Sequence, residues 1–235
     1  MKLHLFSSGT ITAWKHLLVR GAPEGIRISV PVPFYLLEHN DEFVLFDTGQ
    51  QVPEQPFSDD APYIPHVKPE DRAVVQLKKY GVSPERIKYI VLSHHHADHS
   101  QGLPDFPGVP CVVRNEEFQY GAMKRLKEQD PGRDWIHPEE DFDLFGDGHA
   151  SCIPTPGHTL GHQSLLLVSD DSRIILLAAD AAYTEEALKQ TPLEAEKENP
   201  YWRTIGMFRK FMQDGAQIIT GHDPEIWEIL QKQYP

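Results

Sequence analysis

The sequence has no long hydrophobic run and a deficit of positive charge. No stretch approaches the roughly 20 consecutive apolar residues that a membrane span needs, and the N-terminus, MKLHLFSSGTITAWKHLL, lacks the apolar segment and small-residue cleavage site of a signal peptide. The 22 Lys and Arg against 35 Asp and Glu give a formal net charge of −13. That balance argues against binding to nucleic acid, which needs a basic face, and against an anionic membrane surface.

Cysteine is also scarce. Only Cys111 and Cys152 occur, each within a short apolar stretch. Such residues are typical of buried free thiols in a protein of a reducing compartment. The sequence therefore predicts a cytoplasmic protein with neither a disulfide nor a thiolate metal site.

The order of predicted elements indicates an α/β fold built of layers. Two apolar runs flank the turn signal His39-Asn40-Asp41, which predicts a hairpin. Further strands are predicted within residues 87–93, 162–180 and 217–223, and helices at residues 69–81, 116–129, 201–215 and 224–233. No linker divides the 235 residues, so we expect one domain, residues 1–235, with sheets covered by helices.

Residues 51–69 contain five prolines and little periodicity. A loop of this length in a compact domain is usually functional or disordered. Its apolar residues Phe57, Tyr63 and Ile64 favour a lid or pocket wall over a linker.

The segment SHHHADH, residues 93–99, follows a short apolar strand and has the spacing of metal ligands. Side chains at i and i+2 of an extended chain point to the same side, so His94 and His96 can bind one ion. Asp98 and His99 follow where the chain must turn and can reach a second ion. In this register the side chain of His95 points away from both ions. A solvated polar loop is the alternative interpretation of the same residues.

Three later segments offer the remaining ligands. His158 lies in the turn TPGHTLGHQS, and two predicted strands end on Asp180 and His222. Together these residues complete two coordination spheres: His94, His96 and His158 in one, Asp98, His99 and His222 in the other, and Asp180 bridging the two. Imidazole and carboxylate ligands without thiolate suit two divalent ions, zinc first, with iron, cobalt or manganese as alternatives.

The motifs HHHADHSQG, TPGHTLGHQS, LAADAAYT and TGHDPE, in this order, resemble those of the metallo-β-lactamase superfamily. The segment FDTG, residues 46–49, is similar to the Asp-x-Gly element of that superfamily, in which Asp47 would support the metal loop. The resemblance runs from about residue 30 to the C-terminus. It implies an αββα sandwich, two β-sheets flanked by helices, and a dinuclear metal hydrolase.

Within that superfamily the sequence is most similar to N-acyl-homoserine lactonases, through TPGHTLGHQSLLL and through Tyr183, three residues after Asp180. The resemblance implies a small-molecule lactone substrate, opened by a hydroxide held between the metals. Tyr183 would donate a hydrogen bond to the oxyanion, and Asp98 would carry the proton to the leaving group. The acyl chain would contact Phe57, Tyr63, Ile64, Ala97 and Tyr183. Some of these lactonases carry an aromatic residue at the position of Ala97, so the accepted chain length is left open.

Two other functions remain compatible with the same ligands. A glyoxalase II-like thioesterase, or another ester hydrolase of the superfamily, is one, although an anionic thiol conjugate would favour a basic patch. The second is a non-catalytic metal-binding scaffold, which would need neither a second ion nor an open coordination position. The sequence leaves a homodimer open as well.

Overall fold

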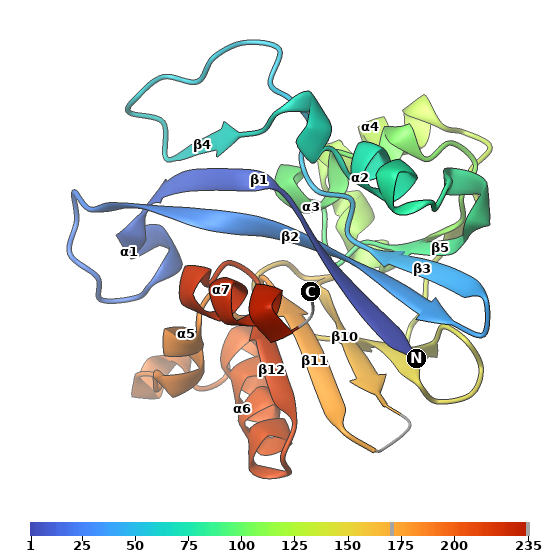
Figure 1. The fold of residues 1–235 in the computed structure, drawn as a ribbon. Coiled ribbons are helices and arrows are strands. Elements are labelled where there is room, and N and C mark those ends of the chain that lie inside the picture. The colour runs from blue at the N-terminus through green and yellow to red at the C-terminus, as the bar shows by residue number, and fades with distance from the viewer. Residues whose placement is uncertain (170–171, 234–235) are drawn as a thin grey trace.

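Two β-sheets packed face to face form the centre of the computed structural model, which describes residues 1–169 and 172–233 (Figure 1). The first sheet has the order β4 (Tyr63–His66), β1 (Lys2–Trp14), β2 (Arg27–His39), β3 (Glu42–Phe46), β5 (Ile87–Val91), β6 (Cys111–Val112), β7 (Trp135–Ile136). The second has the order β12 (Gln217–Thr220), β11 (Ile174–Ala179), β10 (Gln163–Val168), β9 (Ala150–Pro154), β8 (Phe142–Asp143).

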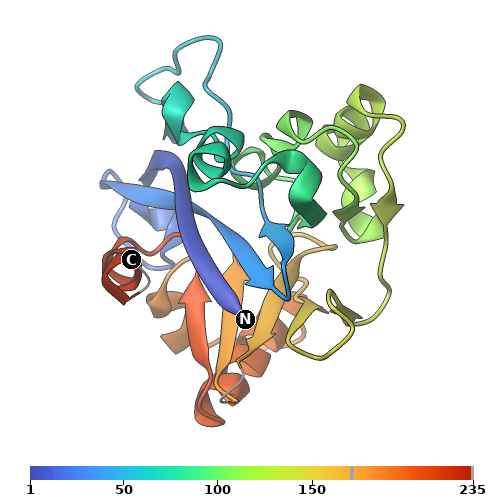
Figure 2. The same ribbon diagram turned by 45° about the vertical axis from the view of Figure 1, so that its right-hand side comes forward.

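Helices cover the outer face of each sheet (Figures 1 and 2). The α-helices are α1 (Lys15–Leu18), α2 (Ala73–Tyr80), α3 (Ala97–Ser100), α4 (Gly121–Gln129), α5 (Glu185–Lys189), α6 (Pro200–Gln213) and α7 (Pro224–Gln233). Short 3₁₀ turns lie at Pro69–Asp71, Pro84–Arg86, Leu103–Asp105, Asn115–Gln119 and Glu194–Glu196. No helix in the described ranges is long and apolar enough to cross a membrane.

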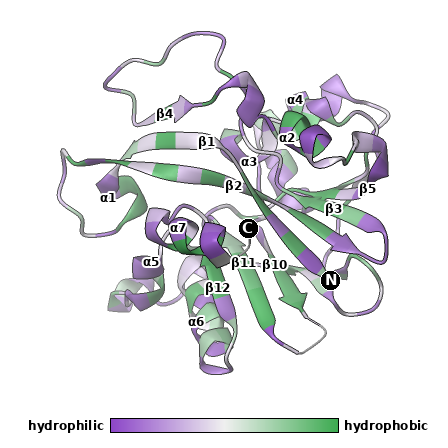
Figure 3. Ribbon diagram, viewed as in Figure 1, coloured by the Kyte–Doolittle hydropathy of each residue, from purple (hydrophilic) through white to green (hydrophobic). Residues whose placement is uncertain are grey.

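Strand β2 shows why the layers form. Its residues alternate between two cores, because successive side chains of a strand point to opposite faces. Phe34 and Leu36 pack with α2 and α4 on the outer side, whereas Tyr35 and Leu37 pack between the sheets. Residues of α5 and α6, such as Leu188 and Phe208, cover the outer side of the second sheet. Figure 3 shows the resulting hydrophobic colour along β10 and β11. The predicted αββα sandwich is confirmed.

The local predictions are largely confirmed. The β2–β3 hairpin turns at Asn40 and Asp41, both with positive φ (49° and 64°), as a tight hairpin turn requires. The helix predicted at residues 69–81 starts as a 3₁₀ turn, becomes α-helical at Ala73, and ends at Gly81 with φ 94°. The turn between β10 and β11 falls partly on residues 170–171, outside the described residues.

The strands depart from the prediction in two places. Before the predicted hairpin, Lys2–Trp14 form a further strand, β1, and both β1 and β2 extend over 13 residues. The proline-rich segment 51–69 is not all loop, because Tyr63–His66 form β4 and pair with β1. Proline is tolerated there since β4 is the edge of the sheet.

Candidate metal centre

The ends of four strands meet at one edge of the sandwich. Strands β3 and β5 are parallel neighbours in the first sheet, and β11 and β12 are parallel neighbours in the second. Parallel strands present their carboxyl ends at the same edge, so the residues that follow them come close together. These residues are Asp47 after β3, His94–His99 after β5, Asp180 after β11 and His222 after β12, and His158 joins them from the turn between β9 and β10.

The first group of possible ligands is His94, His96, His158 and Asp180, whose nearest nitrogen and oxygen atoms all lie within 4.8 Å of one another. The Nε2 atom of His158 is 3.1 Å from Nε2 of His94 and 2.9 Å from Nδ1 of His96. Oδ2 of Asp180 is 3.3 Å from the same His158 nitrogen. Three imidazole nitrogens and one carboxylate oxygen therefore face a common point.

The second group is Asp98, His99, Asp180 and His222, again within 4.8 Å. Oδ1 of Asp180 lies 3.1 Å from Nε2 of both His99 and His222. Oδ2 of Asp98 lies 3.5 Å from the first of these nitrogens and 3.4 Å from the second. Asp180 thus turns one oxygen to each group, which is the arrangement expected of a bridging carboxylate.

The unsatisfied atoms of these groups fit divalent cations. His99 Nε2 and Asp180 Oδ1 are buried and have no hydrogen-bond partner among the described residues, a costly state that a bound cation would relieve. Burial lowers the pKa of His158 to about 4 and holds the pKa of His94 well below its usual range. Both imidazoles are therefore neutral near pH 7, the form that binds a metal.

Hydrogen bonds hold the Nδ1 atoms of His99 and His222, the ring nitrogens that point away from Asp180. Nδ1 of His99 lies 2.7 Å from Oδ2 of Asp47, and Nδ1 of His222 lies 2.7 Å from the backbone oxygen of Pro31. Each Nδ1 donates its proton to an oxygen, which leaves each Nε2, turned toward Asp180, as the ring atom that would bind a cation. Asp47 also accepts from the backbone nitrogen and hydroxyl of Ser93 (2.7 and 2.9 Å), the supporting position expected for it.

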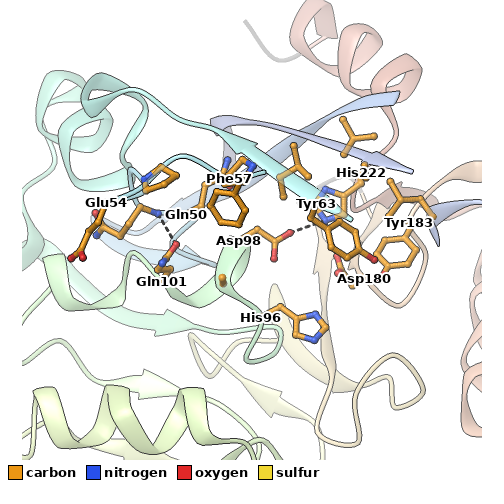
Figure 4. A pocket seen from close by; sticks show the side chains of 18 of the residues that line it. Gln50, Glu54, Phe57, Tyr63, His96, Asp98, Gln101, Asp180, Tyr183 and His222 are labelled. Atoms are coloured by element: carbon orange, nitrogen blue, oxygen red, sulfur yellow. Dashed lines mark hydrogen bonds and ion pairs between the residues drawn. The ribbon is translucent and has the colours of Figure 1, made fainter. Parts of the chain in front are cut away.

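The two groups open onto a cavity of about 640 Å³ (Figure 4). Phe57, Tyr63, Ala97 and Tyr183 line it, as do Ile11, Ala13, Leu18 and Val30. Ile64 does not line the cavity, contrary to expectation. Side chains alternate along β4, so Tyr63 and Pro65 face the cavity and Ile64 faces the other side. In Figure 4, Tyr63 and Tyr183 lie at the end beside Asp180 and His222, and Gln50, Glu54 and Gln101 lie at the other end.

Comparison with known proteins agrees with this geometry. Residues 29–222 match the model of the metallo-beta-lactamase superfamily. The chain belongs to this superfamily. N-acyl homoserine lactonase AttM of Rhizobium johnstonii is 31% identical over 99% of this chain and 97% of its own length. N-acyl homoserine lactonase AiiA of Bacillus thuringiensis subsp. kurstaki is 32% identical over 86% of this chain and 84% of its own.

Solved structures of this superfamily include close structural neighbours. A solved structure of an N-acyl homoserine lactone hydrolase, with the product N-hexanoyl-L-homoserine bound at its catalytic metal center, has a TM-score of 0.81. It is 28% identical in sequence, and the match covers 97% of this chain and 95% of that one. The similarity therefore extends over nearly the whole chain, including both sheets.

Backbone strain and close packing surround Asp180. Ala179, directly before it, has φ 45°, which non-glycine residues rarely adopt, and the pairing of β11 with β12 shifts register there. On the other side, a Cβ added to Gly221 would lie 2.6 Å from the backbone oxygen of Ala179 and 3.1 Å from Oδ1 of Asp180. A glycine at position 221 allows the two strand ends to approach closely enough for Asp180 to lie between the two groups.

His95 points away from both groups, as its register implied, and leads to a residue that the sequence did not reveal. Its backbone nitrogen and Nδ1 lie 2.9 and 2.6 Å from Oε2 of the fully buried Glu117. Oε1 of Glu117 accepts from the Thr159 hydroxyl (2.6 Å) and the Gly161 nitrogen (2.9 Å). Glu117 therefore joins the loop of His94 and His96 to the loop of His158. Its sequence context, beside the exposed Glu116, gave no signal of this role.

Proposed function

We propose that this member of the metallo-β-lactamase superfamily is a metal-dependent hydrolase that opens the lactone ring of N-acyl homoserine lactones. The observation that carries the proposal is the pair of histidine–aspartate groups sharing Asp180 at one end of a mainly apolar cavity. The relatives that match along almost the whole chain, named N-acyl homoserine lactonases, support it. We also propose that residues 1–235 act as one domain, because each of the two groups of possible metal ligands combines residues that follow strands of both sheets.

We propose two divalent ions per chain, zinc first and iron, cobalt or manganese as alternatives. His94, His96 and His158 would hold one ion, Asp98, His99 and His222 the other, and Asp180 both. Such a pair of ions supplies an activated water and polarises the carbonyl oxygen of an ester. Nitrogen and oxygen donors without thiolate support this choice of metals.

Tyr183 is proposed as the donor to the oxyanion that forms on the lactone. Its hydroxyl lies 3.2 Å from Nδ1 of His158. When Nε2 of His158 binds a metal, Nδ1 carries the proton and donates it to the Tyr183 oxygen, which leaves the tyrosine proton free for substrate. Burial, reinforced by the charge of Asp180, raises the pKa of Tyr183 well above its usual value, so the hydroxyl stays a donor.

Asp98 is proposed to carry the proton to the leaving alkoxide. Its side chain remains partly accessible, whereas Asp180 is buried, and it lines the cavity. A carboxylate at that position can take a proton at the reaction centre and release it to the leaving oxygen on the same side. The neighbouring Ala97 leaves space where a larger residue would narrow the cavity.

The apolar wall is proposed to hold the acyl chain. Phe57 and Tyr63 are half exposed in the structure (50% and 42%), and covering them with an alkyl chain would remove apolar surface from water. The carbonyl end of the substrate would then lie near Tyr183 and Asp180. With a small neutral lactone as partner, the formal net charge of −13 presents no obstacle, and nucleic acid is not proposed as a partner. Location in the cytoplasm and a homodimer remain predictions.

The test is a pH-indicator assay of purified, metal-loaded protein. Acyl-homoserine lactones with short and long chains are compared with a thioester and a β-lactam, and bound metal is counted in the same sample. We expect proton release with the lactones, lost after treatment with chelator and regained on adding zinc. Turnover of the thioester or the β-lactam without turnover of any lactone would refute the proposal.

A further inference from the structure

A third group of histidine and aspartate lies outside the candidate metal centre, and nothing in the proposed function uses it. It consists of His39, the last residue of β2, and of Asp147 and His149 in the turn between β8 and β9. The yellow segment of this turn lies beside the turn between β2 and β3 in Figures 1 and 2. His39 is eight residues along β2 from Pro31, which contacts His222. At about 3.3 Å per residue, the two sites are roughly 25 Å apart.

The donor atoms of the three residues face one another. Nε2 of His39 lies 2.6 Å from Oδ2 of Asp147, and Nδ1 of His149 lies 3.1 Å from Oδ1. All three residues offer an atom within 4.8 Å of the others. Ligand atoms around a tetrahedral zinc ion are about 3.3 Å apart, given bonds of about 2.0–2.1 Å. The separations of 2.6 and 3.1 Å are close to this value, so small side-chain movements would complete the arrangement.

The backbone holds these residues in place. The Asp143 carboxylate accepts hydrogen bonds from the backbone nitrogens of Phe145, Gly146 and Gly148 (3.2, 2.9 and 2.8 Å), which fixes the turn. Leu144 is buried between the sheets. The backbone oxygen of His149 accepts from Val168 on β10 (2.8 Å). The ligands would therefore need little ordering to bind an ion.

The two imidazoles and the carboxylate are placed so that one ion could bind between them. The rings of His39 and His149 are only 4.7 Å apart between centroids, so a nitrogen of each can reach one ion beside Asp147. Hydrogen bonds from His39 and His149 lower the pKa of Asp147 to about 2, so the carboxylate is ionised near pH 7. One ionised carboxylate between two imidazoles is a ligand set that transition metals favour.

We propose that His39, Asp147 and His149 form a third metal site, which takes a divalent transition-metal ion such as zinc. His39 belongs to the seven-stranded sheet, and Asp147 and His149 to the hairpin of the five-stranded sheet. An ion bound there links the two sheets at the end far from the candidate metal centre. It stabilises the folded chain, because only the folded chain brings the ligands together, and it takes no part in hydrolysis.

The experiment compares metal binding by the wild type with the variants His149→Gln and Asp147→Asn. Protein loaded with zinc is dialysed against micromolar free zinc, and bound metal is counted by mass spectrometry. We expect the wild type to bind about one ion more per chain than either variant, and zinc titration to show at least tenfold weaker binding at that site in both variants. Adding zinc should raise the melting temperature of the loaded wild type and not that of the variants.

His4→Gln is the matched control, because His4 also pairs with a carboxylate, Glu38, at 3.1 Å but belongs to no group of possible metal ligands among the described residues. It should retain the wild-type ion count, and all variants should keep the hydrolytic activity. Equal metal counts and equal zinc-induced shifts in wild type, His149→Gln and Asp147→Asn would overturn the proposal. Having two variants of different chemistry separates loss of the site from a folding defect in one of them.

Discussion

Replacing Glu117 with glutamine removes the charge of a buried side chain while keeping its shape. The carboxylate accepts four hydrogen bonds, two from His95 and one each from Thr159 and Gly161. A glutamine oxygen can keep the Thr159 and Gly161 bonds, and a change of tautomer lets His95 Nδ1 accept from the new amide. The backbone nitrogen of His95 then faces an amide donor and loses its partner.

The expected cost follows from these losses. One buried donor without a partner costs about 1–3 kcal/mol, and hydrogen bonds to a neutral acceptor are weaker by about 1 kcal/mol each than those to a charged one. Glu117 is completely buried, so water does not compensate. With the weakening of the Thr159 and Gly161 bonds added, we expect Glu117→Gln to lower the free energy of unfolding by about 3–5 kcal/mol. Glu117 connects the loop of His94 and His96 with the loop of His158. Because both loops would lose this common partner, bound metal should also exchange faster.

The assay is urea unfolding of metal-loaded protein, combined with the rate at which a chelator removes the metal. Glu116→Gln is the control, because Glu116 is the exposed neighbour in the same turn and its substitution should change stability by less than about 0.5 kcal/mol. If the two variants unfold at the same urea concentration and lose metal at the same rate, Glu117 does not anchor the loops.

Three further predictions concern other parts of the molecule. Tyr183→Phe should lower kcat by about 10²–10³ with unchanged metal content, and equal turnover would remove Tyr183 from the chemistry. Gly157→Ala should lower the melting temperature, because an added Cβ would lie 2.3 Å from Cα of Tyr201 at φ 144°; an unchanged value would show that the loop moves freely. Burial raises the pKa of Cys111 to about 12 from 9.0, so this thiol and the buried Cys152 should resist a thiol reagent at pH 8 until the protein is unfolded. The stabilisation from the neutral Cys111 thiol should be complete below about pH 9 and lost as the pH rises through about 12. Rapid labelling of either cysteine in the native protein would contradict their burial.

Much of the candidate metal centre could be predicted because its signals are local. His94, His96, Asp98 and His99 lie within six residues, and their spacing alone indicates which side chains point together. The other three ligands were less obvious, yet each stands at a strand end or turn that hydrophobic patterning marks. Parallel pairing of β11 with β12 then brings Asp180 and His222 to one edge. The structure brings all seven residues together, and their assignment to ions remains a proposal.

Other features depended on contacts between distant segments. Ile64 seemed a pocket residue by composition, but the pairing of β4 with β1 turns it away from the cavity. Glu117 looks like an ordinary helix-start residue in the sequence, and only the fold brings it into contact with both the loop of His95 and the loop of Thr159 and Gly161. His39 and His149 are 110 positions apart, and no periodicity connects them.

The sequence by itself indicated which side chains could bind metal ions, since ligand types and their short-range spacing follow from residue identity and strand geometry. It also indicated the layers, through apolar runs such as residues 30–37 of β2, a strand that is buried on both faces. Only the tertiary structure decided which side chains face the cavity, which carboxylate contacts the loops of His95 and His158, and which residues of distant segments come together as a third group of possible ligands. These depend on strand register and sheet packing, where a shift of one residue turns every side chain to the opposite face.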